Sequence, residues 1–455
     1  MTKEFSGYHS IYILQDVRLL VFPEDSLLNS ERFSRQALIE DILEEMPSPE
    51  KGGRLVNPCL EMSTRESVLR TMSCLAREHQ MYLAYSFGDK VPCAGPGCPP
   101  DGHYLYNSIA LLDDGGNFVA KYHKMQLYYE FHYNIPSDCP GHFNPVVTYD
   151  APFGRLGFLV CYDLLFHSPG VELVEQYQVD TIIYATYWFN YVPFVGGVQM
   201  QQAFAMRHKV NFLASDVQTD EGPNLGLGIF SGRRGALAYS NSPDGDSKLV
   251  IATIPQKSGH PKAAKTCPAH PKKVIVSRSS AGWASKVANF QLNVSLVKVI
   301  PLDSALGEDF VEHCCPYSGI CCSVFYHASN VQQFRREHFV LLFGNVTSGA
   351  LGQERYPIRQ EFCGMAACET ANCSRFATTS HTRFHSVDLV AKLKSKYVYP
   401  GVVTSNLGLL PTSKWTYRTA QAGGKSTISV SKAKEPLVAV TLYGRLYEED
   451  PPYKH

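Results

Sequence analysis

The thiol of Cys161 stands where a cysteine can act as a nucleophile. It follows Phe158, Leu159 and Val160, a short apolar run typical of a strand buried on both faces of a covered sheet. Ligand crevices of α/β sheets commonly lie at the carboxyl ends of such strands. A deprotonated thiol there could attack a carbonyl carbon. The alternative is that Cys161 is one more buried thiol of the core.

Two charged side chains earlier in the chain also follow predicted strands. Glu24 comes after the apolar run Val17–Phe22, and Lys124 comes after Phe118–Tyr122. Taken alone, a carboxylate at a strand exit is equally a turn former or a helix cap, and a lysine there is normally a solvated charge. Glu130 lies in an aromatic run just beyond Lys124. A carboxylate among aromatic rings tends to be paired with another group.

The segments that must position these groups alternate between strands and helices. Apolar residues at helical spacing predict an amphipathic helix over Glu66–Gln80, and a second helix is predicted over Gln199–Lys209. Asp41–Glu45 also has a helical pattern, and Ser168 is predicted to cap a helix that starts at Pro169. Further strands are predicted at Met81–Phe87, Tyr104–Leu112, Asp180–Thr186 and Asn211–Ser215, with a hairpin turn at Asp113–Asn117. This alternation is typical of an α/β domain.

The composition changes after residue 255. Residues 256–286 are rich in Lys, Pro, Ser and His, which favours a linker or long loop. From residue 287 onward, short β-like runs alternate with turns and cysteines, which predicts a smaller, mostly β, cysteine-rich domain held by disulfides. We therefore predict a catalytic domain over 1–255, a linker over 256–286 and a β domain over 287–455.

Charge and cysteine content narrow the class of protein. Lys plus Arg equals Asp plus Glu at 42 each, so nothing indicates a broad surface for nucleic acid. No apolar stretch reaches the length of a transmembrane segment. Fourteen cysteines and three N-glycosylation sequons, at Asn293, Asn345 and Asn372, favour a secreted, disulfide-bonded glycoprotein. The chain opens without a signal peptide, so we expect the natural N-terminus to lie further upstream.

Four motifs carry a resemblance to a known family. They are Phe22-Pro-Glu-Asp25, Val119-Ala-Lys-Tyr-His-Lys124, the run from Cys161 to Pro169, and Thr186-Tyr-Trp-Phe-Asn190. In this order and spacing, the chain resembles the nitrilase (carbon–nitrogen hydrolase) superfamily, and closely its secreted branch of vanins (pantetheinases) and biotinidase. The resemblance implies an αββα sandwich joined to a β-rich second domain. It also implies a strand and a long helix before Glu24, which the first sixteen residues do not show.

The resemblance also assigns roles to the charged residues and the thiol. Glu24 would be the general base and Cys161 the nucleophile that attacks an amide carbonyl. Lys124 and the backbone N–H of Tyr162 would stabilise the oxyanion, an effect worth roughly 3–4 kcal/mol per donor. Glu130 would be a second carboxylate beside Lys124. An acid and an amine are released, and the chemistry needs no metal or organic cofactor.

The substrate is narrowed only to its class. Trp188 and Asn190 would line the pocket by resemblance, although an aromatic residue after a strand is more often a core residue. The resemblance leaves pantetheine-like and biotinyl amides open, and the oligomeric state undefined. A second hypothesis is a catalytically inactive secreted binding protein of the same fold. A third is that the paired cysteines near 314–322 bind zinc, although they lack the usual C-x₂-C spacing.

Overall fold

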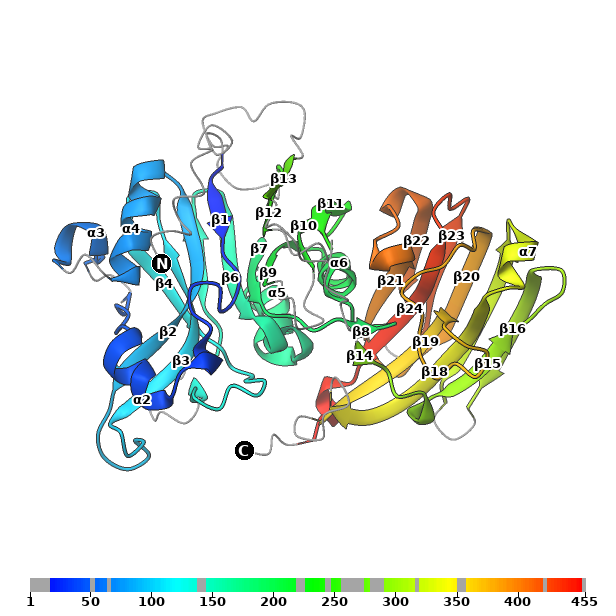
Figure 1. Ribbon diagram of the computed structural model, residues 1–455, viewed down its shortest axis with the longest axis horizontal. Coiled ribbons are helices and arrows are strands. Elements are labelled where there is room, and N and C mark those ends of the chain that lie inside the picture. The colour runs from blue at the N-terminus through cyan, green and yellow to red at the C-terminus, as the bar shows by residue number, and fades with distance from the viewer. Residues whose placement is uncertain are drawn as a thin grey trace. The chain divides into compact units, whose positions relative to one another are not determined.

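The computed structural model describes residues 17–49, 54–63, 67–136, 145–217, 226–241, 247–254, 274–278, 290–315, 319–349, 357–419 and 424–451. These residues form two compact units. The first holds the described residues of Met1–Trp188, Val210–Val217 and Thr253–Lys272, and the second holds the others (Figure 1).

Two layers of strands pack face to face in the first unit (Figure 1). One sheet has the order β1-β2-β3-β4, and the other layer contains β9, β7, β6 and β5 in that order. In the second layer, β6, β7 and β9 run parallel, so their carboxyl ends meet at one edge. The strands are β1 (Leu19–Val21), β2 (Tyr82–Pro92), β3 (His103–Leu112), β4 (Phe118–His123), β5 (Thr148–Ala151), β6 (Gly154–Val160), β7 (Thr181–Thr186) and β9 (Asn211–Asp216).

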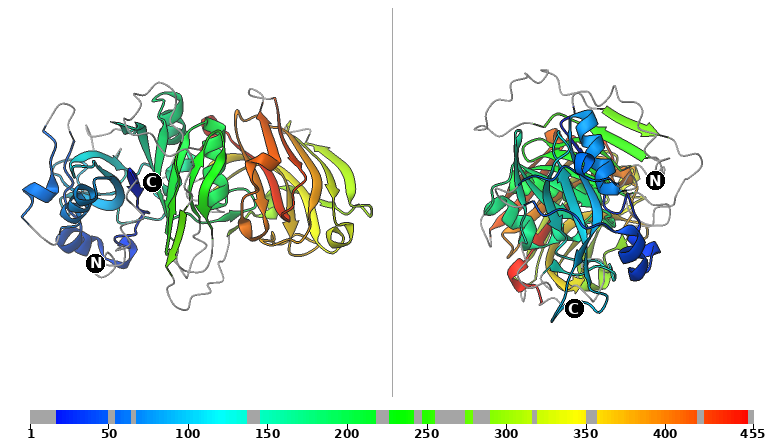
Figure 2. Two further views of the ribbon diagram at one scale, coloured as in Figure 1. Left: turned by 90° about the horizontal axis from the view of Figure 1, so that it is seen from above. Right: turned by 90° about the vertical axis from the view of Figure 1, so that its left-hand side faces the viewer.

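The outer face of the first sheet is covered by α4 (Val68–His79), which packs on β2 and β3 (Figure 2). The helix starts where the Ser67 side chain accepts a hydrogen bond from the Arg70 N–H, and it ends at Gln80 in the left-handed conformation. Met72 is fully buried on its inner face. The predicted helix is thus confirmed, and the short helices α2 (Arg35–Ala37) and α3 (Pro58–Glu61) precede it.

Two other helix predictions were wrong in detail. The helix expected over Asp41–Glu45 is instead a π-helix at Leu38–Ile42. After Cys161, a π-helix at His167–Val171 leads into the short α5 (Glu172–Glu175). The π-helix begins after Phe166 with no side-chain cap, and the Ser168 hydroxyl donates to the Glu172 carboxylate at 2.8 Å.

The second unit contains a sandwich of two five-stranded sheets, with the orders β15-β18-β19-β24-β21 and β16-β17-β20-β23-β22. A continuous apolar core lies between them, and the disulfide Cys322–Cys363 joins β17 to β19 across it. The strands are β15 (Lys298–Leu302), β16 (Glu308–Cys314), β17 (Cys321–Ala328), β18 (His338–Gly349), β19 (Pro357–Cys368), β20 (Phe384–Lys392), β21 (Tyr397–Thr404), β22 (Trp415–Thr419), β23 (Lys425–Ser431) and β24 (Leu437–Arg445).

The second unit also holds α6 (Gly197–His208), which packs on β21, and the antiparallel pair β12 and β13. The strand β13 (Val274–Arg278) lies within the predicted linker, most of which falls outside the described residues. The remaining elements are β8 (Tyr191–Val192), β10 (Leu227–Ser231), β11 (Gly235–Ser240), β12 (Ser247–Ile251), β14 (Phe290–Gln291) and α7 (Val331–Phe334). No helix among the described residues is both long and apolar enough to cross a membrane.

Candidate active site

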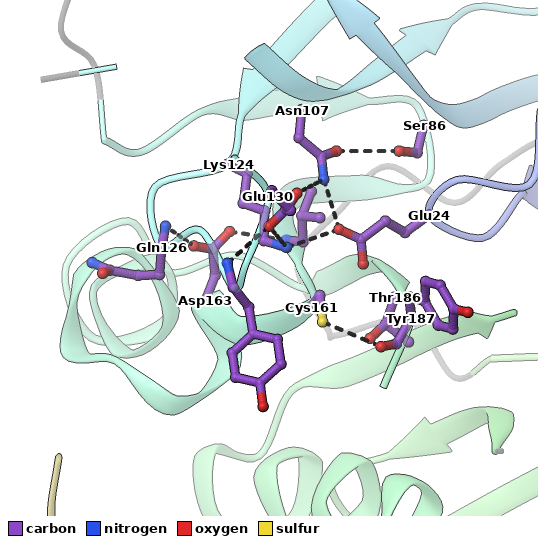
Figure 3. Close-up of polar contacts among 12 residues, drawn as sticks. Glu24, Ser86, Asn107, Lys124, Gln126, Glu130, Cys161, Asp163, Thr186 and Tyr187 are labelled. Carbon is purple, nitrogen blue, oxygen red and sulfur yellow. Dashed lines mark hydrogen bonds and ion pairs between the residues drawn. The ribbon is translucent and has the colours of Figure 1, made fainter. Parts of the chain in front are cut away.

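Glu24, Lys124 and Cys161 come together in the first unit (Figure 3). Lys124 directly follows β4, Cys161 directly follows β6, and Glu24 lies in the turn after β1. Their exposed fractions are 3% for Glu24, 2% for Lys124 and 6% for Cys161. Three segments far apart in the sequence thus place a carboxylate, an ammonium and a thiol in one buried site.

Lys124 is held between two carboxylates. Its Nζ lies 2.8 Å from Glu24 Oε1 and 2.6 Å from Glu130 Oε2. Burial alone would lower the pKa of Lys124, because it disfavours the charged ammonium. The negative charges of Glu130 and Glu24 outweigh this effect and raise the pKa well above its ordinary value. Lys124 therefore stays positively charged at neutral pH.

The two oxygens of Glu24 differ in their partners. Oε1 accepts hydrogen bonds from Lys124 at 2.8 Å and from Asn107 Nδ2 at 2.7 Å. Oε2 is buried and has no hydrogen-bond partner within the described part of the chain. Burial raises the pKa of Glu24, Lys124 opposes this rise, and the nearby charge of Glu130 adds to it. Glu24 thus keeps one oxygen available to take up a proton.

Cys161 occupies a constrained turn. Its φ of 44° lies in the left-handed region, which is uncommon for a residue other than glycine and often marks a functional site. The Tyr184 hydroxyl donates to its carbonyl oxygen at 2.8 Å, and its thiol donates to the Tyr187 carbonyl at 3.7 Å. Burial raises the pKa of Cys161 well above its ordinary value; the charge of Glu24 adds to this, whereas that of Lys124 opposes it. The resting thiol is therefore neutral and needs a base to become a nucleophile.

Asn107 is a site residue that the sequence analysis did not single out. Its Nδ2 donates to Glu24 Oε1 and to Glu130 Oε1, so one amide links both carboxylates. The backbone carbonyl oxygen of Asn107 also accepts a hydrogen bond from the backbone N–H of Lys124 at 2.8 Å. The sequence feature that could have indicated this residue is the polar pair Asn107 and Ser108, which interrupts the apolar strand β3 and is buried in the structure.

Asp163 is the second residue whose place only the structure shows. It is completely buried two positions after Cys161. Burial raises the pKa of Asp163 to about 7, while the hydrogen bond from Tyr122 and the charge of Lys124 act in the opposite direction. Figure 3 shows this carboxylate beside the loop that carries Gln126.

The remaining predicted residues lie in different surroundings. Tyr162 follows the nucleophile, and its ring packs on Tyr128 at 5.1 Å between centroids. Trp188 is buried, and its backbone N–H donates to Asp216 Oδ1 at 3.0 Å. Asn190 belongs to the second unit, where its Oδ1 accepts the N–H of Gly197 at 2.6 Å at the start of α6. The roles of these residues toward a substrate stay predictions.

Three of the four paired cysteines near 314–322 are held in disulfides, which rules out a zinc site built from all four. Cys314 is bonded to Cys321, and Cys322 to Cys363, so these sulfurs are not thiolates. Three more disulfides, Cys59–Cys74, Cys93–Cys98 and Cys368–Cys373, close local loops. Among the described residues, no cluster of three or more His, Cys, Asp or Glu side chains is arranged to hold a metal ion.

Known proteins match both parts of the chain. The carbon-nitrogen hydrolase family model matches residues 11–206, and the vanin C-terminal domain model matches residues 290–450. Pantetheinase from Homo sapiens is 31% identical over 96% of this chain and 81% of its own length. Biotinidase from Takifugu rubripes is 29% identical over 96% of this chain and 86% of its own length. These similarities confirm the predicted fold class, an αββα sandwich of the nitrilase type followed by a mostly β, cysteine-rich domain.

Proposed function

The chain belongs to the vanin (pantetheinase) and biotinidase branch of the nitrilase superfamily, and we propose that it cleaves a linear carboxamide through a thioester on Cys161. It is a hydrolase of carbon–nitrogen bonds other than peptide bonds. One observation supports the mechanism most: Glu24 Oε2 has no hydrogen-bond partner among the described residues, and it lies in the same buried site as a neutral thiol and a charged lysine.

The first half-reaction begins with proton transfer from the Cys161 thiol to Glu24. The sulfur then attacks the amide carbon, and negative charge develops on the carbonyl oxygen. Two carboxylates occupy two of the three N–H donors of Lys124, which leaves one to bind that oxygen together with the backbone N–H of Tyr162. The carbon–nitrogen bond breaks, and the amine leaves with the proton that Glu24 returns.

The second half-reaction releases the acid. A water molecule gives a proton to Glu24 and attacks the thioester carbon, and the carbon–sulfur bond breaks. The Cys161 sulfur regains its proton from Glu24. The site is then ready for another amide, and the net reaction consumes one water. Asn107 and Glu130 keep Lys124 and Glu24 in place through both halves.

We propose pantetheine-like or biotinyl amides as the substrates, because the relatives are named pantetheinase and biotinidase. We also propose that the protein is extracellular, since those relatives and five disulfides among the described residues favour an oxidising compartment. We further propose that residues 1–255 form the catalytic domain, because Glu24, Lys124 and Cys161 all lie within them.

A parallel hydrolysis assay with pantetheine and biotinyl-lysine tests this proposal. The wild-type protein should release amine from one of the two amides, and Cys161→Ala should release none while keeping its circular dichroism spectrum. Equal turnover by Cys161→Ala would contradict the proposed nucleophile. A wild-type protein that hydrolyses neither amide would contradict the substrate class, and one inert toward every linear amide would favour the binding-protein alternative.

A further inference from the structure

One buried carboxylate fastens together the two segments that carry Lys124 and Cys161. Asp163 Oδ1 accepts the backbone N–H groups of Met125 at 3.2 Å and Gln126 at 2.8 Å. Its Oδ2 accepts the Tyr122 hydroxyl at 2.7 Å and the backbone N–H of Val160 at 3.1 Å. Both oxygens are therefore fully engaged, and all four partners are donors.

These partners flank the catalytic pair on both sides. Tyr122 precedes Lys124 by two positions, whereas Met125 and Gln126 follow it directly. Val160 is the residue immediately before Cys161. The bonds therefore act on the backbone on either side of each group, and they reach neither the ammonium nor the thiol itself.

Both segments need such an external restraint. Cys161 has a positive φ, a conformation that costs about 1–3 kcal/mol and persists only where the surroundings enforce it. Lys124 lies beyond the last residue of β4, where the regular ladder of that strand has ended. Within the described structure, its backbone N–H bond to the Asn107 carbonyl ties it to β3 but not to the turn of Cys161.

We infer that Asp163 is a positioning residue that sets the Lys124 ammonium relative to the Cys161 thiol, so that both can act on one carbonyl group. The inference rests on the proposed thioester mechanism. A group that acts through positioning affects the rate of the chemical step, because a misplacement of about 1 Å can cost roughly 10²-fold. We expect little effect on substrate binding, since Asp163 is completely buried and both of its oxygens are bonded to protein groups.

Asp163→Asn is the sharpest test, because the two side chains have nearly the same shape. An amide has one oxygen and one NH₂ group, so the NH₂ group must face two donors whichever way it is turned. Asp113→Asn is the matched control. Asp113 also accepts backbone N–H bonds, from Gly115 at 2.9 Å and Asn117 at 2.8 Å, but it lies in the turn between β3 and β4, away from the site.

The expected result is a kcat about 10²-fold lower in Asp163→Asn, with KM changed by less than about threefold. Asp113→Asn should lower the melting temperature but keep kcat. A kcat within threefold of wild type in Asp163→Asn would overturn the inference. So would losses of kcat that track the melting temperature equally in both variants. If Asp163→Asn does not fold, Tyr122→Phe removes one of the four bonds and should lower kcat at least about threefold at constant KM; an unchanged kcat there would also overturn it.

A second readout needs no substrate. The rate at which iodoacetamide alkylates Cys161 is measured against pH, with the modified residue identified by peptide mass spectrometry. Because the charge of Lys124 favours the thiolate, its displacement should move the midpoint of the alkylation curve to higher pH. Tyr122→Phe is the variant for this measurement, because it removes one bond to Asp163 and keeps the negative charge, whose loss in Asp163→Asn would itself favour the thiolate. Asp113→Asn should not move it. Coinciding curves for wild type and Tyr122→Phe would overturn the inference, whereas failure of the proposed function would appear only in the turnover assay.

Discussion

The Lys124 ammonium lies 2.8 Å from Glu24 Oε1, and both side chains are almost completely buried. This ion pair occupies only one oxygen of Glu24, while Glu130 balances the lysine from its other side. A buried charge is stable only when it is paired and hydrogen-bonded, which this arrangement achieves for Lys124. The same contacts leave Glu24 Oε2 without a hydrogen-bond partner in the part of the chain that the structure describes, so the network that stabilises the lysine also defines the base.

Glu24→Gln should remove the base while keeping the shape of the side chain. We expect kcat to fall at least about 10²-fold, because general base catalysis contributes that much or more. The base must be ionised, so kcat of the wild-type protein should fall as the pH drops through the pKa of Glu24. Because this pKa is raised, the fall should occur above pH 4.5, the ordinary pKa of a glutamate. A pH–rate profile of both proteins checks this. If kcat of Glu24→Gln fell at the same pH and to the same extent as that of the wild type, Glu24 would not be the general base.

The difference in stability between Glu24→Gln and the wild type should change with pH. Because folding raises the pKa of Glu24, the folded state binds this proton more tightly than the unfolded state. The contribution of Glu24 to stability is therefore fully present below pH 4.5 and is lost as the pH rises through its folded-state pKa. Thermal unfolding of Glu24→Gln and wild type at several pH values should show the variant gaining relative stability as the pH rises. A difference that does not change with pH would contradict the raised pKa.

The Asn107 amide donates to two carboxylates, and Asn107→Asp should put a third negative charge in its place. We expect the pKa of Glu24 to rise further and kcat at pH 7 to fall at least about tenfold, the effect of one pKa unit. Asn117→Asp is the control, because Asn117 also donates to a carboxylate, that of Asp113, but in the turn after β3. Equal pH–rate profiles for the two variants would show that Asn107 has no special role at the site.

The disulfide Cys322–Cys363 should stabilise the second unit more than a local disulfide stabilises the first. It closes a separation of 41 residues and joins two sheets, whereas Cys93–Cys98 closes only 5. Loop-closure entropy predicts losses of about 4 and about 2 kcal/mol when each pair is replaced by alanine. Denaturant unfolding of the two double variants measures the difference. A larger loss for the Cys93–Cys98 pair would contradict this prediction.

The three sequons should differ in their use. Asn293 and Asn372 are exposed, whereas Asn345 Nδ2 donates to Glu361 at 3.4 Å and its Oδ1 is buried. A glycan is attached through Nδ2, so Asn345 cannot carry one in this conformation. Protein expressed in eukaryotic cells should therefore yield glycopeptides at Asn293 and Asn372. A glycopeptide at Asn345 would show that the local structure differs.

The sequence predicted the parts of the site that depend on local pattern. The apolar run of β6 places Cys161 at a strand end, and the turn at Asp113–Asn117 places Lys124 at the end of β4. The fold class, the family and the type of enzyme are confirmed. The domain boundaries and the roles of the site residues stay predictions.

The rest of the site depends on contacts between distant residues. Asn107 and Glu24 are 83 positions apart, and Asp163 and Tyr122 are 41 apart, so no local pattern relates them. Ser168 shows the opposite failure, because its local pattern predicted a cap. Its hydroxyl instead donates to the Glu172 carboxylate.

The most direct test of the thioester is to trap it with hydroxylamine during turnover. If an acyl group is carried on Cys161, hydroxylamine attacks the thioester carbon, so acyl hydroxamate should form at the expense of free acid while amine release continues. Cys161→Ala should form neither product. Free acid as the sole product at every hydroxylamine concentration, with the wild-type protein active, would contradict a covalent intermediate on Cys161.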